Sequence, residues 1–233
     1  MHTACLSAGN RNNSCMNLFV VGDVHGCYYT WQQLLRHWQP AKELLIQVGD
    51  LVDRGNFAPA TVASAISLRQ RHPDTAFFLK GNHEASLWQH CGPDGPYPPW
   101  LQWGGRGTLF QYQMHSPATL RHHAAWLSQL PLYWENKHLF ISHAGLADTA
   151  QPLDENNPDG ILWRRGPLHN IGRRQVVGHT PTPDGTPIFD EAANVFYLDT
   201  GAYDGRGLTA IRLSPTGDLL DTITIPTQAD DIA

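Results

Sequence analysis

Three short segments in the first half of the chain carry residue types that bind divalent metal ions. They are Gly22-Asp23-Val24-His25-Gly26, Gly49-Asp50-Leu51-Val52-Asp53-Arg54-Gly55 and Gly81-Asn82-His83-Glu84. One Asp-x-His pair alone would be a weak signal, because aspartate often caps a helix and a single histidine is more often packed or solvent-exposed than liganded. Three clusters, each preceded by an apolar run and flanked by glycines that let loops approach closely, instead indicate a shared metal site.

Two later segments also place a histidine after a short apolar run: Leu139-Phe140-Ile141-Ser142-His143-Ala144-Gly145 and Val176-Val177-Gly178-His179-Thr180. Together the segments supply oxygen and nitrogen donors but no thiolate, namely Asp23, His25, Asp50, Asn82, His143 and His179. Such a set suits manganese, iron, zinc or cobalt better than magnesium, because imidazole is abundant. If one carboxylate bridges, the donors divide between two ions about 3.5–4 Å apart, an arrangement that clamps the attacking and leaving oxygens of phosphoryl transfer.

The elements that must position these donors can be predicted from periodicity. Apolar runs and amphipathic stretches alternate at residues 17–21, 28–38, 44–48, 59–71 and 76–79, which predicts the order β-α-β-α-β. Units of this kind form parallel sheets with right-handed crossovers, and functional groups gather beyond the carboxyl ends of the strands. The first three donor segments directly follow the three predicted strands, so we expect them to meet at one edge of a sheet.

Composition excludes several classes of protein. The 233 residues are 41% hydrophobic and 16% charged, as in a globular enzyme, and the formal net charge of -5 argues against binding along a nucleic-acid backbone. No stretch approaches the ~20 apolar residues of a membrane span, and the first residues lack the apolar core of a signal peptide. The four cysteines form no Cys-x-x-Cys pair. We therefore expect a cytoplasmic protein with reduced thiols and with neither a nucleic-acid nor a membrane partner.

Domain organisation follows from where the donors lie. Residues 1–16 are polar and aperiodic, and we expect them to form a disordered N-terminal extension. The Pro- and Gly-rich stretch 91–99 cannot be a domain linker, because proposed ligands lie on both sides of it and must converge on one site. We expect a single catalytic domain over residues 17–233.

The segments GDVHG, GDLVDRG and GNHE, in this order, resemble the signature of the phosphoprotein phosphatase family of metallophosphoesterases. The resemblance extends through ISHAG, VVGH and LDTGAY and covers about residues 17–213. Residues 100–108 are also similar to a segment of bacterial and phage members. The resemblance implies an α/β fold, a calcineurin-like four-layer sandwich with two mixed β-sheets flanked by helices.

The resemblance also implies how the donors are shared. Asp23, His25 and Asp50 would bind one metal ion, and Asp50, Asn82, His143 and His179 the other, with Asp50 as the bridge. Two divalent ions per chain are implied, of which we expect manganese, with iron, zinc and cobalt as alternatives. A hydroxide held between the ions would then attack the phosphorus directly.

Three further residues match the family's catalytic and phosphate-binding positions. His83 would protonate the departing ester oxygen, and Asp53 would orient it. A positioned imidazolium contributes about 10²- to 10⁴-fold in rate, and a carboxylate partner keeps it charged near neutrality. Arg54 would grip two non-bridging phosphate oxygens with its planar fork.

A second phosphate-binding arginine is expected in Ile161-Leu162-Trp163-Arg164-Arg165-Gly166. If this segment is extended, its successive side chains point to opposite faces, so only one of the two arginines can enter the site. The Trp-x-Arg spacing of bacterial members favours Arg165 over Arg164.

Two questions stay open at this point. Glu84 either supports the site by bonding a ligand histidine or is an exposed acid at the start of a helix. Aromatic residues near the catalytic loops either belong to the core or form an apolar rim that selects the ester: Tyr97, Trp100, Trp103, Trp163 and Tyr203.

Three functions are compatible with these residues. The first is a protein phosphatase that acts on phosphoserine and phosphothreonine, and by extension on phosphotyrosine, in proteins or peptides. The second is a symmetrical bis(5'-nucleosyl)-tetraphosphatase, which would share the metal motifs but bind a nucleotide. The third is a non-catalytic scaffold, which the complete donor set together with His83 and Arg54 disfavours.

Overall fold

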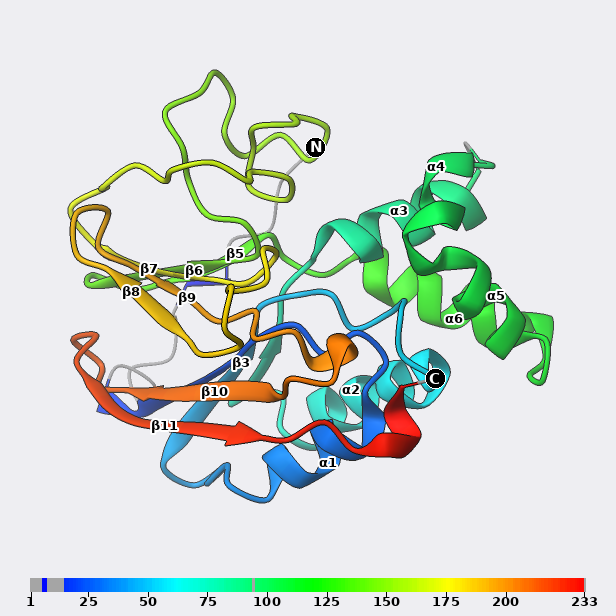
Figure 1. Ribbon diagram of the computed structural model, residues 1–233, viewed down its shortest axis with the longest axis horizontal. Coiled ribbons are helices and arrows are strands. Elements are labelled where there is room, and N and C mark those ends of the chain that lie inside the picture. Colours follow the sequence, from blue (N-terminus) through cyan, green and yellow to red (C-terminus); the bar gives the residue numbers. More distant parts are fainter. Residues whose placement is uncertain (1–5, 8–14, 94, 233) are drawn as a thin grey trace.

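The computed structural model describes residues 6–7, 15–93 and 95–232, and its strands form two mixed sheets (Figure 1). The five-stranded sheet has the order β11-β10-β2-β3-β4. Within it β2 (Asn17–Val21), β3 (Glu43–Gln47) and β4 (Ala76–Phe78) run parallel to one another. β10 (Leu208–Leu213) lies antiparallel both to β2 and to β11 (Leu219–Ile225).

The six-stranded sheet has the order β1-β5-β6-β7-β9-β8. Its three parallel strands are β6 (Leu139–Ser142), β7 (Arg174–Val177) and β9 (Val195–Tyr197). They are flanked by two antiparallel strands, β5 (Tyr133–Glu135) beside β6 and β8 (Ile188–Asp190) beside β9. Two mixed sheets are the fold class that the resemblance implied, and this expectation is confirmed.

Helices connect and cover the five-stranded sheet. α1 (Tyr28–Leu35) joins β2 to β3, and α2 (Ala58–Arg71) joins β3 to β4, so the predicted β-α-β-α-β order is confirmed. After β4 come α3 (Asn82–Cys91) and, packed beside it, α6 (Pro117–Ser128). Between these two the chain forms α4 (Pro98–Trp100), a π-helical segment (Leu101–Gly105) and α5 (Arg106–Tyr112). Every helix in the described ranges is too short or too polar to cross a lipid bilayer.

The parallel strands are buried on both faces, as strands between two layers must be. Along β2, Leu18 and Val20 contribute to the core between the sheets, where they meet Ile141 of β6. The alternate residues Phe19 and Val21 belong to the core beneath the helices. Because successive side chains of a strand point to opposite faces, β2 contributes to both cores. A shift by one residue would exchange the two sets of side chains, so this packing fixes the register of β2 and the position of the loop that follows it.

The outer face of the six-stranded sheet is covered by irregular chain (Figure 1). Residues 143–173, between β6 and β7, contain no helix and lie over this face. Ile161 and Leu162 of this segment pack against Phe140 of β6 in a small separate core. Residues 143–173 thus form an irregular layer over this sheet, and they carry the arginine pair toward the site.

The predicted disordered extension at 1–16 falls mostly outside the described residues. Within it, β1 (Leu6–Ser7) pairs in parallel with β5. Met16 packs against the core between the sheets. The division into an extension and a catalytic domain over 17–233 stays a prediction.

The carboxyl-terminal segment caps the first helix. No side chain of the residue at the N-cap position of α1 bonds to the helix. Instead, the buried carboxylate of Asp231 accepts hydrogen bonds from the backbone nitrogens of Tyr29 at 2.9 Å and Thr30 at 2.7 Å, and from the Thr30 hydroxyl at 2.6 Å. The Asp231 carbonyl also accepts from the backbone nitrogen of Asn56 at 2.9 Å. The end of the chain therefore holds the loops that follow β2 and β3.

We expect Asp231→Ala to lower the free energy of unfolding by about 1–3 kcal/mol, because buried amides at the start of α1 lose their acceptor. Asp230→Ala is the matched control, since this neighbouring side chain is exposed. Urea unfolding of both variants, followed by circular dichroism, measures the difference. Equal stability of the two variants would show that the cap contributes nothing.

Candidate active site

Five chain segments bring their polar residues to one edge of the two sheets. The six predicted donors follow β2, β3, β4, β6 and β7 in turn: Asp23 and His25, then Asp50, Asn82, His143 and His179. All six are at most 3% exposed. Contacts such as the hydrogen bond from the His179 backbone nitrogen to Asp23 Oδ2, at 3.0 Å, join segments 156 residues apart in the sequence.

Four of these donors point their ligand atoms at one place. His143 Nε2 lies 2.9 Å from Asn82 Oδ1, 3.1 Å from His179 Nδ1 and 3.5 Å from Asp50 Oδ2. Ligands about 2.1 Å from a metal ion and at right angles to one another lie about 3 Å apart, so these separations fit one ion. His143 Nδ1 donates to the carbonyl oxygen of Val48 at 3.1 Å, which leaves the lone pair of Nε2 facing the cluster.

A second group adjoins the other side of Asp50. His25 Nε2 lies 3.4 Å from Asp50 Oδ2, while His25 Nδ1 donates to the carbonyl oxygen of Val52 at 2.9 Å. His25 Nε2 and Asp23 Oδ1 are buried and have no hydrogen-bond partner among the described residues. Because unpaired buried polar atoms cost free energy, a cation bound to these atoms would stabilise the site. The ligand atoms of His25, Asp50 and His83 lie within 4.8 Å of one another, as do those of Asp50, His143 and His179, so the residues present fit a metal ion on each side of Asp50.

The pKa values of the buried groups in the site favour the binding of a cation. Burial raises the pKa of Asp23 well above its ordinary value, and the nearby charges of Asp199 and Asp50 raise it further. Burial would also raise the pKa of Asp50, but His143 and the other surrounding histidines outweigh burial and lower it. Burial lowers the pKa of His143 and of His179. A lowered pKa favours the neutral imidazole, which is the form that binds metal.

The backbone is strained at the same residues. Among the non-glycine residues of the described ranges that have positive φ, five belong to the predicted site: His25 at 46°, Asp50 at 59°, Asp53 at 72°, Arg54 at 72° and His179 at 69°. Such conformations cost about 1–3 kcal/mol each and persist only where surrounding contacts determine them. Gly178 makes close approach possible, because a Cβ there would overlap Asp23 Oδ1.

Glu84 makes some of the contacts that hold these strained loops in place. Its carboxylate is buried and accepts hydrogen bonds from the backbone nitrogens of Asp50 at 2.7 Å, Leu51 at 2.8 Å and Gly81 at 2.8 Å. These bonds tie the loop after β3 to the loop after β4. Glu84 is therefore not an exposed acid at a helix start, and its carboxylate bonds to backbone nitrogens where a ligand histidine was the expected partner. In this position Glu84 holds the Asp50 loop in place.

His83 lies next to the donor cluster and is held by Asp53. Its Nδ1 donates to Asp53 Oδ2 at 2.6 Å, and its Nε2 lies 3.8 Å from Asp50 Oδ2 and 3.3 Å from Arg54 Nη2. Burial alone would lower the pKa of His83, but the carboxylates of Asp50 and Asp53 outweigh burial and raise it. A charged imidazole with Nε2 beside the donor cluster has the geometry of a general acid.

A cavity of about 730 Å³ opens over the cluster. Its wall includes Asn82 and His83 together with the two predicted phosphate-binding residues, Arg54 and Arg165. The Arg54 guanidinium lies 4.3 Å from the centre of the Tyr203 ring, which holds the fork in place. Two guanidinium groups around one space can bind the non-bridging oxygens of a phosphoryl group.

The two adjacent arginines of the loop layer point to different places. Arg165 lines the cavity, and its Nη1 donates to the carbonyl oxygen of His179 at 3.4 Å. Arg164 donates instead to Asp159 Oδ1 at 2.7 Å and to the carbonyl oxygen of Pro167 at 3.1 Å. This placement agrees with Arg165 as the phosphate-binding residue, a role that stays a prediction.

The aromatic residues divide between the rim and the interior. Tyr97, Trp103 and Trp163 form a row with ring centres 6.0 and 5.7 Å apart, and the two tryptophans line the cavity. Trp100 is buried, and its Nε1 donates to Asp53 Oδ2 at 2.6 Å. The sequence left Trp100 open between the core and the rim, and it gave no sign of the hydrogen bond to Asp53.

Asp199 is a site residue that the sequence analysis missed. It follows β9, is fully buried, and its Oδ2 has no hydrogen-bond partner among the described residues. Burial raises the pKa of Asp199 to about 6. The signal was present in Leu198-Asp199-Thr200-Gly201, where an acid and a glycine follow an apolar run in the manner of the other donor segments.

Comparison with known proteins identifies similar chains. The model of the calcineurin-like phosphoesterase family matches residues 16–206. Serine/threonine-protein phosphatase 1 of Salmonella typhimurium is 29% identical over 214 residues, which cover 84% of this chain and 92% of the relative. The asymmetrical bis(5'-nucleosyl)-tetraphosphatase PrpE of Geobacillus sp. (strain WCH70) is also 29% identical, over 244 residues that cover 91% of this chain and 94% of the relative.

A solved structure shares the fold. It is a protein serine/threonine phosphatase from Saccharomyces cerevisiae with similarity to human phosphatase PP5. It superposes on this chain with a TM-score of 0.68 at 18% sequence identity. The match covers 97% of this chain and 84% of the chain in that structure. The relatives therefore include two substrate classes, and the tetraphosphatase among them is asymmetrical, whereas the alternative expected from the sequence is a symmetrical one.

His83→Asn should lower kcat by about 10² or more while metal content stays near that of the unmodified protein, because His83 is assigned proton transfer and no ligand role. Asn82→Ala should instead lower metal content, since Asn82 Oδ1 lies within the donor cluster. Steady-state kinetics combined with elemental analysis separates the two effects. Equal loss of metal from both variants would contradict this division of roles.

Arg165→Ala should raise the barrier of kcat/KM by about 2–4 kcal/mol, because a charge-assisted contact to the phosphoryl group is lost. Arg164→Ala is the matched control and should have little effect, since Arg164 bonds to Asp159 and Pro167 at the surface. Both variants are compared by kcat/KM at equal metal content. A larger loss at Arg164 would reverse the assignment.

Proposed function

The chain belongs to the calcineurin-like phosphoesterase family, and from this premise we propose that it is a protein phosphatase that acts on phosphoserine and phosphothreonine, and by extension on phosphotyrosine. It would be a phosphoric monoester hydrolase whose partners are phosphorylated proteins or peptides. We further propose manganese as the native metal and the cytoplasm as the compartment.

Two groups of residues would hold the metal ions of this enzyme. Asp23, His25 and Asp50 would hold one ion, and Asp50 together with Asn82, His143 and His179 would hold the second. When bound, two divalent ions supply Lewis-acid polarisation of the phosphate and a more acidic water.

The remaining residues of the chain bind the phosphoryl group and deliver a proton. Arg54 and Arg165, on the cavity wall, neutralise and orient the non-bridging oxygens. His83, charged and held through Nδ1 by Asp53, donates its Nε2 proton to the ester oxygen as the bond to phosphorus breaks. This step matters most for a serine or threonine ester, because an unprotonated alkoxide is a poor leaving group.

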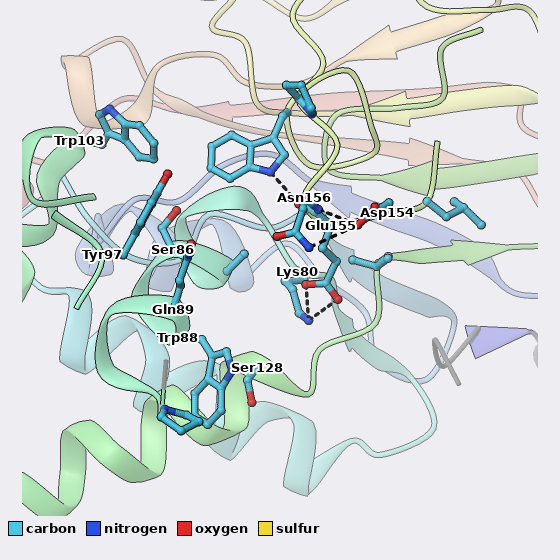
Figure 2. Close-up of a pocket in the computed structure, with 16 residues that line it drawn as sticks. Lys80, Ser86, Trp88, Gln89, Tyr97, Trp103, Ser128, Asp154, Glu155 and Asn156 are labelled. Carbon is cyan, nitrogen blue, oxygen red and sulfur yellow. Dashed lines mark hydrogen bonds and ion pairs between the residues drawn. The ribbon is translucent and has the colours of Figure 1, made fainter. Parts of the chain in front are cut away.

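The observation that favours a protein substrate is the charge of the neighbouring cavity. This second cavity, of about 740 Å³, shares Trp103 and Trp163 with the first, and Figure 2 shows the residues that line it. Its one lysine, Lys80, is already paired with Glu155, at 2.9 and 3.0 Å. Asp154 adds a further carboxylate to the wall.

A tetraphosphate chain carries several negative charges and would need cations along its whole length. Arg54 and Arg165 match a single phosphoryl group, and the adjoining acidic wall repels further phosphates. The polar and aromatic side chains of that wall suit a peptide instead, through contacts from Tyr97, Gln89 and Ser86.

Dinucleoside tetraphosphate hydrolysis is the second candidate. A specific observation supports it, namely the tetraphosphatase relative that is as similar to this chain as the protein phosphatase is. The scaffold function is disfavoured by the complete donor set and by the His83–Asp53 pair beside it.

The test is a parallel assay of the purified protein with manganese on a phosphoserine peptide, a phosphotyrosine peptide, p-nitrophenyl phosphate and diadenosine tetraphosphate. We expect kcat/KM for the phosphoserine peptide to exceed that for the dinucleotide by at least about 10-fold. Dialysis against a chelator should abolish turnover, and added manganese should restore it. A preference for the dinucleotide would assign the second function, and full turnover without metal would contradict both.

A further inference from the structure

The carboxylate that holds the general acid is itself held from a separate segment. Asp53 is fully buried and has positive φ. Besides the bond from His83, its Oδ2 accepts a hydrogen bond from Trp100 Nε1 at 2.6 Å, and its Oδ1 accepts one from the Thr108 hydroxyl at 2.5 Å. Both carboxylate oxygens are thereby engaged, so the carboxylate cannot rotate without breaking a buried bond.

The segment that supplies these two donors is not a regular helix. In a regular α-helix, residues eight apart are separated by about 12 Å along the axis, too far for two side chains to reach one carboxylate easily. Here α4 and α5 are joined by the π-helical segment Leu101–Gly105, which contains a non-helical residue, Gly104, with φ of 124°. The kink turns Trp100 and Thr108 toward the same point. Irregular turns of this kind occur often at functional sites.

The two glycines of the kink let it close on the catalytic loop. A Cβ at Gly104 would lie 2.8 Å from the Cβ of Asp53 and 2.9 Å from the backbone nitrogen of Arg54, closer than atoms tolerate. A Cβ at Gly105 would overlap the Trp100 ring. The two glycines in the pattern Trp-x-x-x-Gly-Gly-x-x-Thr at 100–108 therefore allow this segment to pack directly against the loop that carries Asp53 and Arg54.

We propose that Trp100 and Thr108 are positioning residues that hold the Asp53 carboxylate in the one orientation in which it fixes the His83 ring for proton transfer. They touch neither substrate nor metal, and they act through Asp53. The inference rests on the proposed function only in that His83 must protonate a leaving group.

The test compares two leaving groups. p-Nitrophenolate departs with little protonation, whereas a serine alkoxide needs a proton, so a disturbed general acid should harm the second reaction more. Thr108→Val, which keeps the side-chain shape, should lower kcat on a phosphoserine peptide by about 10-fold but on p-nitrophenyl phosphate by at most about 3-fold, with KM little changed. Thr108→Ser, which keeps the hydroxyl, should retain nearly full activity. Trp100→Phe should show the same dependence on the leaving group.

Two controls separate positioning from general destabilisation. Thr61→Val removes another buried hydroxyl, which lies in α2 and bonds to the carbonyl oxygen of Phe57, and it should leave both kcat values near those of the unmodified protein. Asp53→Asn combined with Thr108→Val should be no slower than Asp53→Asn alone, because Thr108 acts only through that carboxylate. Equal losses on both substrates, additive losses in the double variant, or full activity of Thr108→Val would overturn the proposal. If the unmodified protein with manganese hydrolysed neither ester, the proposed function itself would fail.

Discussion

The Asp50 carboxylate, buried among three histidines, is the interaction on which the rest of the structure depends. Its Oδ2 lies 3.4, 3.8 and 3.5 Å from the Nε2 atoms of His25, His83 and His143, and its Oδ1 accepts from the His83 backbone nitrogen at 3.1 Å. Moving such a charge out of water costs several kcal/mol, which only well-placed partners and a bound cation can offset. Those partners come from both sheets, so neither sheet can shift without separating the two halves of the site.

This demand explains why the strained backbone lies where it does. Sharp loops with positive φ at His25, Asp50 and His179 turn the side chains back over the ends of the strands. Strain of this size persists because the loops are anchored elsewhere, by Glu84 to the backbone of Asp50 and by Asp231 to the start of α1. The buried core between the sheets supplies the rigidity that these anchors need, since Leu18 and Ile46 fix the register of the two strands that lead into the loops.

Much of this could be predicted from the sequence, because the relevant signals are local. The alternation of apolar runs located β2, β3 and β4 to within about one residue. A donor directly after an apolar run marked each position that the parallel strands bring to a common edge, and the same signal was present, though not used, at Asp199. The irregular course of residues 143–173 could not be predicted, because they bury Ile161 and Leu162 on the sheet without helical periodicity.

What the sequence could not reveal are contacts whose donors have no local signature. The indole of Trp100 has the same N–H whether it fills a core or holds a carboxylate, and its partner Asp53 lies 47 residues away. The sequence gives no sign that Asp231 caps α1, because its partner Thr30 lies 201 residues away in sequence.

The choice of substrate also could not be predicted from the sequence. Arg54 follows β3, whereas Arg165 and Asp154 lie in the segment between β6 and β7. Arg54 and Arg165 line one cavity and Asp154 lines its neighbour, so the charges that meet a substrate become visible only in the folded chain. Local motifs therefore determine the chemistry of this site, whereas its selectivity depends on distances that only the folded chain defines.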